Sequence, residues 1–217
     1  MSFIDKNMLE EAVRKALEAS PKRNFKQSIE LIVVLRDVDV KSPEGRIREI
    51  VFLPHKFKKD VKVCVAAEGD MVLKAKEAGA HLVLTRDDLN KIQGNRKEAK
   101  RIAQQCDWVL VRADLMPLVG RILGPALGPR GKVPTPVPMN ANIIELIDKY
   151  RRATMIRTKD QPQVMCRVGT EDMDIKEIVE NISAVLSALE GKLKSIHNIE
   201  KIVVKTTMGP PVEVKLR

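Results

Sequence analysis

The chain has 217 residues, and its 39 Lys and Arg residues outnumber its 29 Asp and Glu residues, giving a formal net charge of +10. A hydrophobic fraction of 44% supplies enough apolar surface for a core, which excludes a wholly disordered chain. Four Phe, one Trp and one Tyr are too few for a platform of stacked bases, which excludes the usual single-strand RNA-binding modules. No apolar run approaches the ~20 residues of a membrane-spanning helix, and the N-terminus lacks the apolar region of a secretory signal.

The excess of basic residues favours a polyanionic partner over a solvated basic surface with no specific partner. The three cysteines, Cys64, Cys106 and Cys166, form no C-x-x-C motif, and the histidines have no zinc-ligand spacing. We therefore expect no metal and no other cofactor. An odd, scattered set of cysteines indicates reduced, buried thiols in a cytoplasmic protein.

The N-terminal part of the chain predicts a helix followed by two strands. Apolar residues recur at helical spacing from Ile4 to Leu17. Strand-like runs follow at 28–38 and 47–53, and the turn signal between them predicts a hairpin. The basic stretch 54–59 then reads as a linker.

From residue 60 the pattern changes to an alternation of strands and helices. Strands are expected at 61–67, 81–85 and 108–112, and helices from Asp70 to Gly79, over 87–105, and from the cap Asn140 to about 152. Short connections between alternating strands and helices predict a parallel sheet with right-handed crossovers. A segment rich in Gly and Pro, 120–138, interrupts this rhythm.

The C-terminal part again shows the hairpin-like spacing of strands that the N-terminal part shows. Strands are expected at 154–158 and 163–168, then a helix between the cap Asp174 and the terminator Gly191, then strands at 199–206 and 212–216. The sequence therefore predicts an α/β fold with a discontinuous outer domain, 1–59 plus 154–217, and an α/β domain inserted at 60–153. Two chain crossings between the domains make a hinge plausible.

The segment Gly120–Pro136 is the most unusual in the chain. It matches neither G-x-G-x-x-G nor a P-loop. One interpretation is a rigid, Pro-stiffened loop that exposes Arg121, Arg130 and Lys132 to a phosphate backbone. The other is a well-packed connector with no ligand.

Two further segments offer groups to a nucleic acid. In Lys205–Pro211, Thr206 and Thr207 carry small hydroxyls, and Gly209 permits positive φ or close approach to a ribose; the alternative is an ordinary hairpin turn. At the start of the first strand, the pattern favours Phe25 as a core plug over an exposed ring. Glu30 alternates with apolar neighbours and is expected to face outward.

No arrangement of side chains points to catalysis. The chain lacks a nucleophile elbow and a supported Cys–His pair. An enzyme remains as an alternative only through the middle domain, where a nucleotide or phosphoester could bind at a switch point, with the Gly120–Gly131 loop holding its phosphate.

Several motifs together resemble the L-one family of ribosomal proteins of the large-subunit side stalk. Met116–Gly120 through Leu127–Pro134 resembles the family signature, and Thr206–Pro210, Leu53–His55 and the Phe25 segment follow in the expected arrangement. The resemblance covers essentially the whole chain, and Thr135–Pro138 gives it an archaeal character.

The resemblance implies an α+β outer domain of split βαβ character, an inserted Rossmann-like three-layer α/β domain, and a hinge. It implies a cytoplasmic, non-enzymatic protein, a monomer off the ribosome, that binds large-subunit rRNA and acts beside exit-site tRNA, assisting release of deacylated tRNA. Many members also repress their own mRNA. Carried over, the residues lining the rRNA surface are Phe25, Ser28, Glu30, Thr207, Met208 and Gly209, with Lys26, Arg167 and Lys205 as neighbours.

Overall fold

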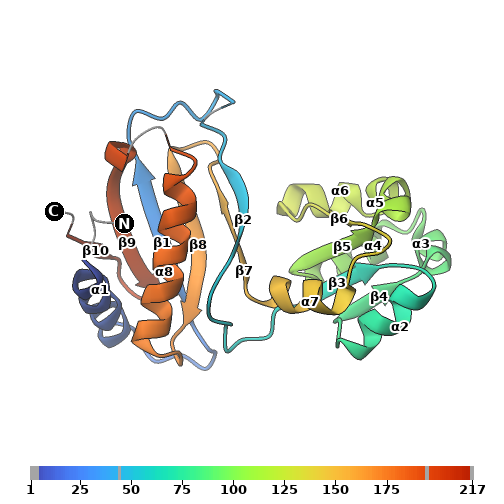
Figure 1. Ribbon diagram of the computed structural model, residues 1–217, viewed down its shortest axis with the longest axis horizontal. Coiled ribbons are helices and arrows are strands. Elements are labelled where there is room, and N and C mark those ends of the chain that lie inside the picture. The colour runs from blue at the N-terminus through green and yellow to red at the C-terminus, as the bar shows by residue number, and fades with distance from the viewer. Residues whose placement is uncertain (1–4, 44, 194–195, 216–217) are drawn as a thin grey trace. The chain divides into compact units, whose positions relative to one another are not determined.

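A computed structural model describes residues 5–43, 45–193 and 196–215 of the chain. Contacts divide the chain into two compact units: an outer unit of residues 1–59 and 152–217, and an inserted unit of residues 60–151 (Figure 1). Ile4 and Leu216, which we expected in the first helix and the last strand, lie outside the described residues.

The main sheet of the outer unit is antiparallel throughout and has the strand order β10-β9-β1-β8. Its strands are β1 (Ser28–Leu35), β8 (Gln163–Thr170), β9 (Ile199–Thr206) and β10 (Val212–Val214). Helices α1 (Lys6–Glu18) and α8 (Ile175–Glu190) lie on the same side of this sheet (Figure 1). Alternate β1 residues, from Ile29 to Leu35, are fully buried, and the intervening ones from Ser28 to Val34 are half-exposed on the other face.

The expected hairpin between the first two strands is wrong. β1 pairs with β8 on one side and β9 on the other, so no edge is left for a further strand. β2 (Arg48–Phe52) pairs instead with β7 (Ala153–Arg157) in a separate two-stranded sheet. The residues that were expected to form the hairpin turn instead form a turn of their own before β2, in which Ser42 Oγ donates to Asp39 O at 2.7 Å.

The inserted unit contains a parallel sheet with the order β4-β3-β5-β6. The strands are β3 (Val63–Ala66), β4 (Leu82–Leu84), β5 (Trp108–Arg112) and β6 (Thr135–Val137). Helices α2 (Asp70–Glu77) and α7 (Ile143–Arg151) pack together on one face. The other face carries α3 (Arg86–Ile92), α4 (Arg96–Gln105), α5 (Met116–Ile122) and α6 (Gly124–Leu127) (Figure 1). Together, the parallel and antiparallel sheets and their helices confirm the α/β fold class.

Short 3₁₀ turns complete the described elements: η1 (Ala113–Leu115), η2 (Gly128–Arg130) and η3 (Ile196–Asn198).

Three local expectations for the inserted unit are wrong. The charged segment 87–105 forms two helices rather than one, because Gly94 between them has a φ of 83°, which a continuing helix cannot accommodate. The first part of the Gly/Pro segment, up to residue 130, is mostly helical, since Pro125 and Pro129 stand at helix starts, where no backbone N–H is needed. Its second part contains the short strand β6. Asn142, rather than Asn140, caps α7 by accepting the Ile144 N–H at 3.2 Å.

The expectation of three reduced thiols is also wrong. Cys64 in β3 and Cys106 at the end of α4 form a disulfide, with their Cα atoms 5.7 Å apart. The sequence spacing hides this pairing because the contact depends on where α4 returns the chain to the sheet. Cys166 is free and buried, and burial raises the pKa of its thiol to about 12.

No helix in the described part of the chain is both long enough and apolar enough to cross a membrane.

Candidate nucleic-acid interface

The two segments suspected of contacting nucleic acid lie side by side at one end of the main sheet. The Thr207 N–H donates to Ser28 O at 3.0 Å, and the Ser28 N–H donates to Thr207 Oγ1 at 3.1 Å. Because β1 and β9 are antiparallel neighbours, the start of one strand meets the turn that follows the other. The structure thus joins residues that are 179 positions apart in the sequence.

A buried glutamine, Gln27, holds this junction together. Its Nε2 donates to Ser20 Oγ and to Pro21 O, both at 2.9 Å, and its Oε1 accepts the Met208 N–H at 3.0 Å. Its own N–H donates to Glu171 Oε1 at 2.9 Å. Sequence reasoning missed Gln27, since nothing in the local pattern marks a buried amide before a strand.

Thr206 and Gly209 have different roles from those expected. The Thr206 side chain is fully buried, and its hydroxyl shares a 2.8 Å hydrogen bond with Ser20 Oγ, so it is not available to a ligand. Gly209 does not have a positive φ. A Cβ at this position would lie 2.3 Å from Thr206 Oγ1, so the glycine serves close packing of the turn over a buried hydroxyl.

Two large apolar side chains at the junction remain exposed. Phe25 is 48% exposed and Met208 is 51% exposed. The expectation that Phe25 plugs the core is therefore wrong; the nearby residues that are fully buried are Ile29 and Leu31 in β1. An exposed ring and an exposed thioether offer flat, apolar contact to a base or ribose.

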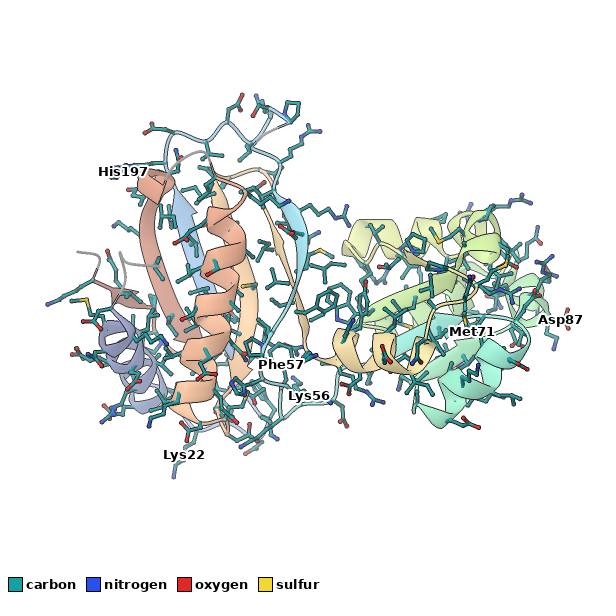
Figure 2. The ribbon with its side chains drawn as sticks, viewed as in Figure 1. Lys22, Lys56, Phe57, Met71, Asp87 and His197 are labelled. Atoms are coloured by element: carbon teal, nitrogen blue, oxygen red, sulfur yellow. A yellow bond between two sulfur atoms is a disulfide. The ribbon has the colours of Figure 1, made fainter. Side chains whose placement is uncertain are left out.

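Three charged side chains form a row across the face of the main sheet opposite α1 and α8. Glu30 in β1 stands in register with Lys205 in β9 and with Arg167 in β8. Lys205 Nζ is 3.7 Å from Glu30 Oε2 and donates to Thr207 O at 3.0 Å. The Arg167 guanidinium lies 4.0 Å from the centre of the Phe57 ring, which is labelled in Figure 2.

The segment 54–59 is packed and is not a free linker as expected. Phe57 is buried beneath Arg167, and the His55 N–H donates to Asn181 Oδ1 at 3.0 Å. Lys26 Nζ donates to Lys58 O at 2.6 Å and lies 2.7 Å from Asp172 Oδ2. Burial opposes ionisation of Asp172, but hydrogen bonds from Lys26 and Thr170 outweigh it and hold the pKa of this carboxyl below its usual value.

The expected basic loop of the inserted unit is only partly exposed. Arg121 is exposed on α5. Arg130 donates to Ala126 O at 2.8 Å, and Lys132 Nζ donates to Ala103 O at 3.0 Å. Burial lowers the pKa of Lys132. Arg130 and Lys132 therefore stabilise helix ends of their own unit, which corrects the expectation of three cations freely offered to phosphate.

A network of ion pairs lies at the carboxyl ends of β3 and β5, where parallel sheets with this strand order commonly bind nucleotides. Arg112 contacts Asp114 at 2.6 Å and Glu68 at 2.8 Å. Arg86 contacts Glu68 at 3.0 Å. These cations are engaged by carboxylates of the same unit. Among the residues that the structure describes, no group of three His, Cys, Asp or Glu side chains is arranged to hold a metal ion.

The fold and the sheet end define the class of this protein. It is an α/β protein of two units that presents exposed apolar, charged and hydroxyl side chains together at one end of its main sheet. Residues 15–210 match the Ribosomal protein L1p/L10e family, and the chain belongs to this family. The family is structural and non-enzymatic, which removes the enzyme alternative.

Curated relatives are similar along the whole chain. The large ribosomal subunit protein uL1 of Hyperthermus butylicus is 68% identical over 218 residues, covering 100% of both chains. The uL1 protein of Staphylothermus marinus is 59% identical, with 99% of each chain covered. The uL1 protein of Saccharolobus solfataricus is 47% identical, with 100% of each chain covered. The archaeal character expected from the sequence agrees with these relatives.

Proposed function

We propose that this protein binds rRNA in the side stalk of the large ribosomal subunit, through the sheet end where residues 25–30 meet residues 205–209. One observation supports this site above the others. Two segments from opposite ends of the chain are held together by partly buried hydrogen bonds, yet they leave Phe25 and Met208 half-exposed. A rigid support under exposed apolar groups lowers the entropy lost on binding.

The groups at this site suit RNA recognition. Phe25 and Met208 offer apolar contact to bases and riboses, while Arg167 and Lys205 provide positive charge for phosphates. Glu30 can accept a hydrogen bond from a base amine or from a ribose 2′-OH. Ser28 is half-exposed beside it, and Lys26 lies on the adjoining segment.

We propose two further roles that follow from the family resemblance. The protein acts beside exit-site tRNA and assists release of deacylated tRNA. It also represses its own mRNA by binding a mimic of the rRNA site with the same surface. If both RNAs bind the same surface, the protein cannot bind them at the same time. An unlabelled rRNA fragment should therefore completely displace a labelled mRNA leader from the protein. Formation of a ternary complex would contradict this role.

We also propose that the two units are domains joined by a hinge. The chain passes between the units only at 59/60 and 151/152, and each unit has its own sheet and buried core. Few covalent crossings and separate cores are the usual properties of independently folding domains.

A pair of methionines tests the rRNA site. Met208 and Met165 are both exposed, at 51% and 50%, but Met165 lies on β8 in register with Ile32, two residues before Arg167 and outside the junction of residues 25–30 with residues 205–209. We expect Met208→Ala to weaken binding to a large-subunit side-stalk rRNA fragment by at least about fivefold, or ~1 kcal/mol, because it truncates a central contact. Met165→Ala should leave the affinity unchanged.

Filter binding or fluorescence anisotropy at one fixed salt concentration measures both variants. Equal losses for Met208→Ala and Met165→Ala would contradict the proposed position of the site. A fragment panel in which no large-subunit rRNA binds more tightly than a random duplex would contradict the proposed function itself.

A further inference from the structure

The inserted unit carries its own cationic surface, and it lies on α4. The outward side of this helix presents Arg96, Lys97 and Lys100, which are all exposed, while Ala99, Ile102 and Ala103 are buried against the sheet. Residues four apart on a helix lie ~6 Å from each other on one face. Arg96 and Lys100 are therefore neighbours, with Lys97 beside them.

These three cations form no ion pairs among the described residues of the inserted unit. No carboxylate of the described inserted unit pairs with Arg96, Lys97 or Lys100. Glu98, the one acidic residue of α4, is held by Arg101 at 3.1 Å. By contrast, Arg112 and Arg86 are bound by Glu68 and Asp114 at the carboxyl edge of the sheet.

Other contacts fix α4 and leave its N-terminal half accessible. Lys132 Nζ donates to Ala103 O near the C-terminal end, where helix carbonyls are otherwise unsatisfied. The Asn95 side chain caps the N-terminal end by accepting the Glu98 N–H at 3.1 Å. The turn at Gly94 brings α3 next to α4, where exposed Lys91 lies 4.0 Å from Asp88 of its own helix. The positive end of the helix dipole has the same sign as these side chains.

We propose that this α4 surface, made of Arg96, Lys97 and Lys100, binds the phosphate backbone of double-stranded RNA. A nucleic-acid duplex is densely charged, with about one negative charge per 1.7 Å of axis in DNA, so a compact group of three cations meets several phosphates at once. The surface has no aromatic side chain for base stacking, and lysine and arginine contacts to phosphate carry no sequence information. Binding here is independent of sequence, and it deepens the proposed function by giving the inserted unit an RNA contact of its own.

A matched pair of triple variants of the full chain tests the surface. Arg96→Gln, Lys97→Gln and Lys100→Gln together remove three charges from α4. Lys74→Gln, Lys76→Gln and Lys149→Gln remove three exposed charges from α2 and α7 on the opposite face of the same sheet. The probe is a random-sequence RNA duplex, titrated over a series of salt concentrations.

We expect the α4 variant to bind this duplex at least tenfold more weakly at low salt. Its slope of log K against log salt should fall by about 2 relative to the wild-type chain, since each phosphate contact contributes ~0.7–0.9. The α2/α7 variant should change the affinity less than threefold and the slope by less than about 1. Matching circular dichroism spectra and melting temperatures confirm that both variants fold.

Equal effects of the two triple variants would overturn the proposal, because bulk charge would then account for the binding. The α4 result is independent of the rRNA site in the outer unit: failure of that site appears as loss of preference for the rRNA fragment, whereas failure of the α4 surface appears only with the random duplex.

Discussion

At the residue scale, the Thr207 hydroxyl is part of the support beneath the site and is not a free ligand group. It accepts from the Ser28 N–H at 3.1 Å and lies 3.3 Å from Ser28 O. Thr207→Val keeps the shape but leaves the Ser28 N–H without this acceptor. We expect a loss of about 1–3 kcal/mol in the free energy of unfolding.

Thr207→Ser is the control for this substitution, since it retains the hydroxyl. Urea denaturation followed by circular dichroism measures both variants. A Thr207→Val protein as stable as the wild-type chain, but unable to bind rRNA, would show instead that the hydroxyl meets the ligand directly.

Gly209 provides a second prediction at this scale. In Gly209→Ala the new Cβ would lie 2.3 Å from Thr206 Oγ1, within a hydrogen-bonded cluster that includes Ser20. Forcing this contact should cost about 1–3 kcal/mol of stability. In the double variant Gly209→Ala/Thr206→Ala the clashing oxygen is gone, so the two effects should be less than additive by at least about 0.5 kcal/mol. Strict additivity in thermal unfolding would contradict the packing role of the glycine.

Free Cys166 in β8 gives a prediction about reactivity with pH. Burial raises its pKa to about 12, so the folded protein holds a neutral thiol at pH 8. Iodoacetamide reacts with thiolates, so mass spectrometry of the native protein should show no adduct at pH 8. Unfolding in urea without reductant should expose one reactive thiol. Because the folded pKa is raised, the stability due to this neutral thiol is complete below the unfolded pKa and is lost as pH rises toward 12.

At the element scale, the bond between Cys64 and Cys106 ties β3 to the end of α4 across 42 residues. Such a cross-link restricts the unfolded chain, and we expect its reduction to lower the stability of the inserted unit by about 2–4 kcal/mol. The variant Cys64→Ala/Cys106→Ala should melt at the same temperature with and without reductant, whereas the wild-type chain should melt lower with reductant. A wild-type melting curve that does not respond to reductant would contradict this role.

The secondary-structure elements that could be predicted from the sequence are those whose ends are determined by residues close to them in the chain. α8 begins at Asp174 with a capping box to Glu177, and β9 and β10 flank a Gly-Pro turn; both signals lie within a few residues. The partners of β1, the disulfide and the buried Gln27 could not be found this way, since each depends on contacts more than forty residues away. The exposure of Phe25 could not be predicted either, since its local sequence pattern fits a core position as well as a surface one.

At the scale of the whole molecule, the outer unit should fold and bind rRNA without the inserted unit. Phe52 and Ala153 are paired across β2 and β7, and the exit at 59/60 comes only seven residues after Phe52, so the exit and re-entry points are close enough to be bridged. A short Gly/Ser linker can therefore replace residues 60–151. We expect native-like circular dichroism and an rRNA affinity within about tenfold of the full chain, because the α4 cations are absent. A folded but non-binding protein would contradict the outer-unit site.

The strand order of the main sheet also limits when this site can exist during synthesis. β1 is made early, but both of its neighbours, β8 and β9, come from the last third of the chain. The inserted unit is complete at residue 151 and can fold as a unit while the first 59 residues still lack their partners. Only when Thr206 to Gly209 emerge from a translating ribosome does the sheet end acquire its second half. A nascent chain therefore cannot present the complete surface before residues 206–209 have been made, however early β1 itself is available.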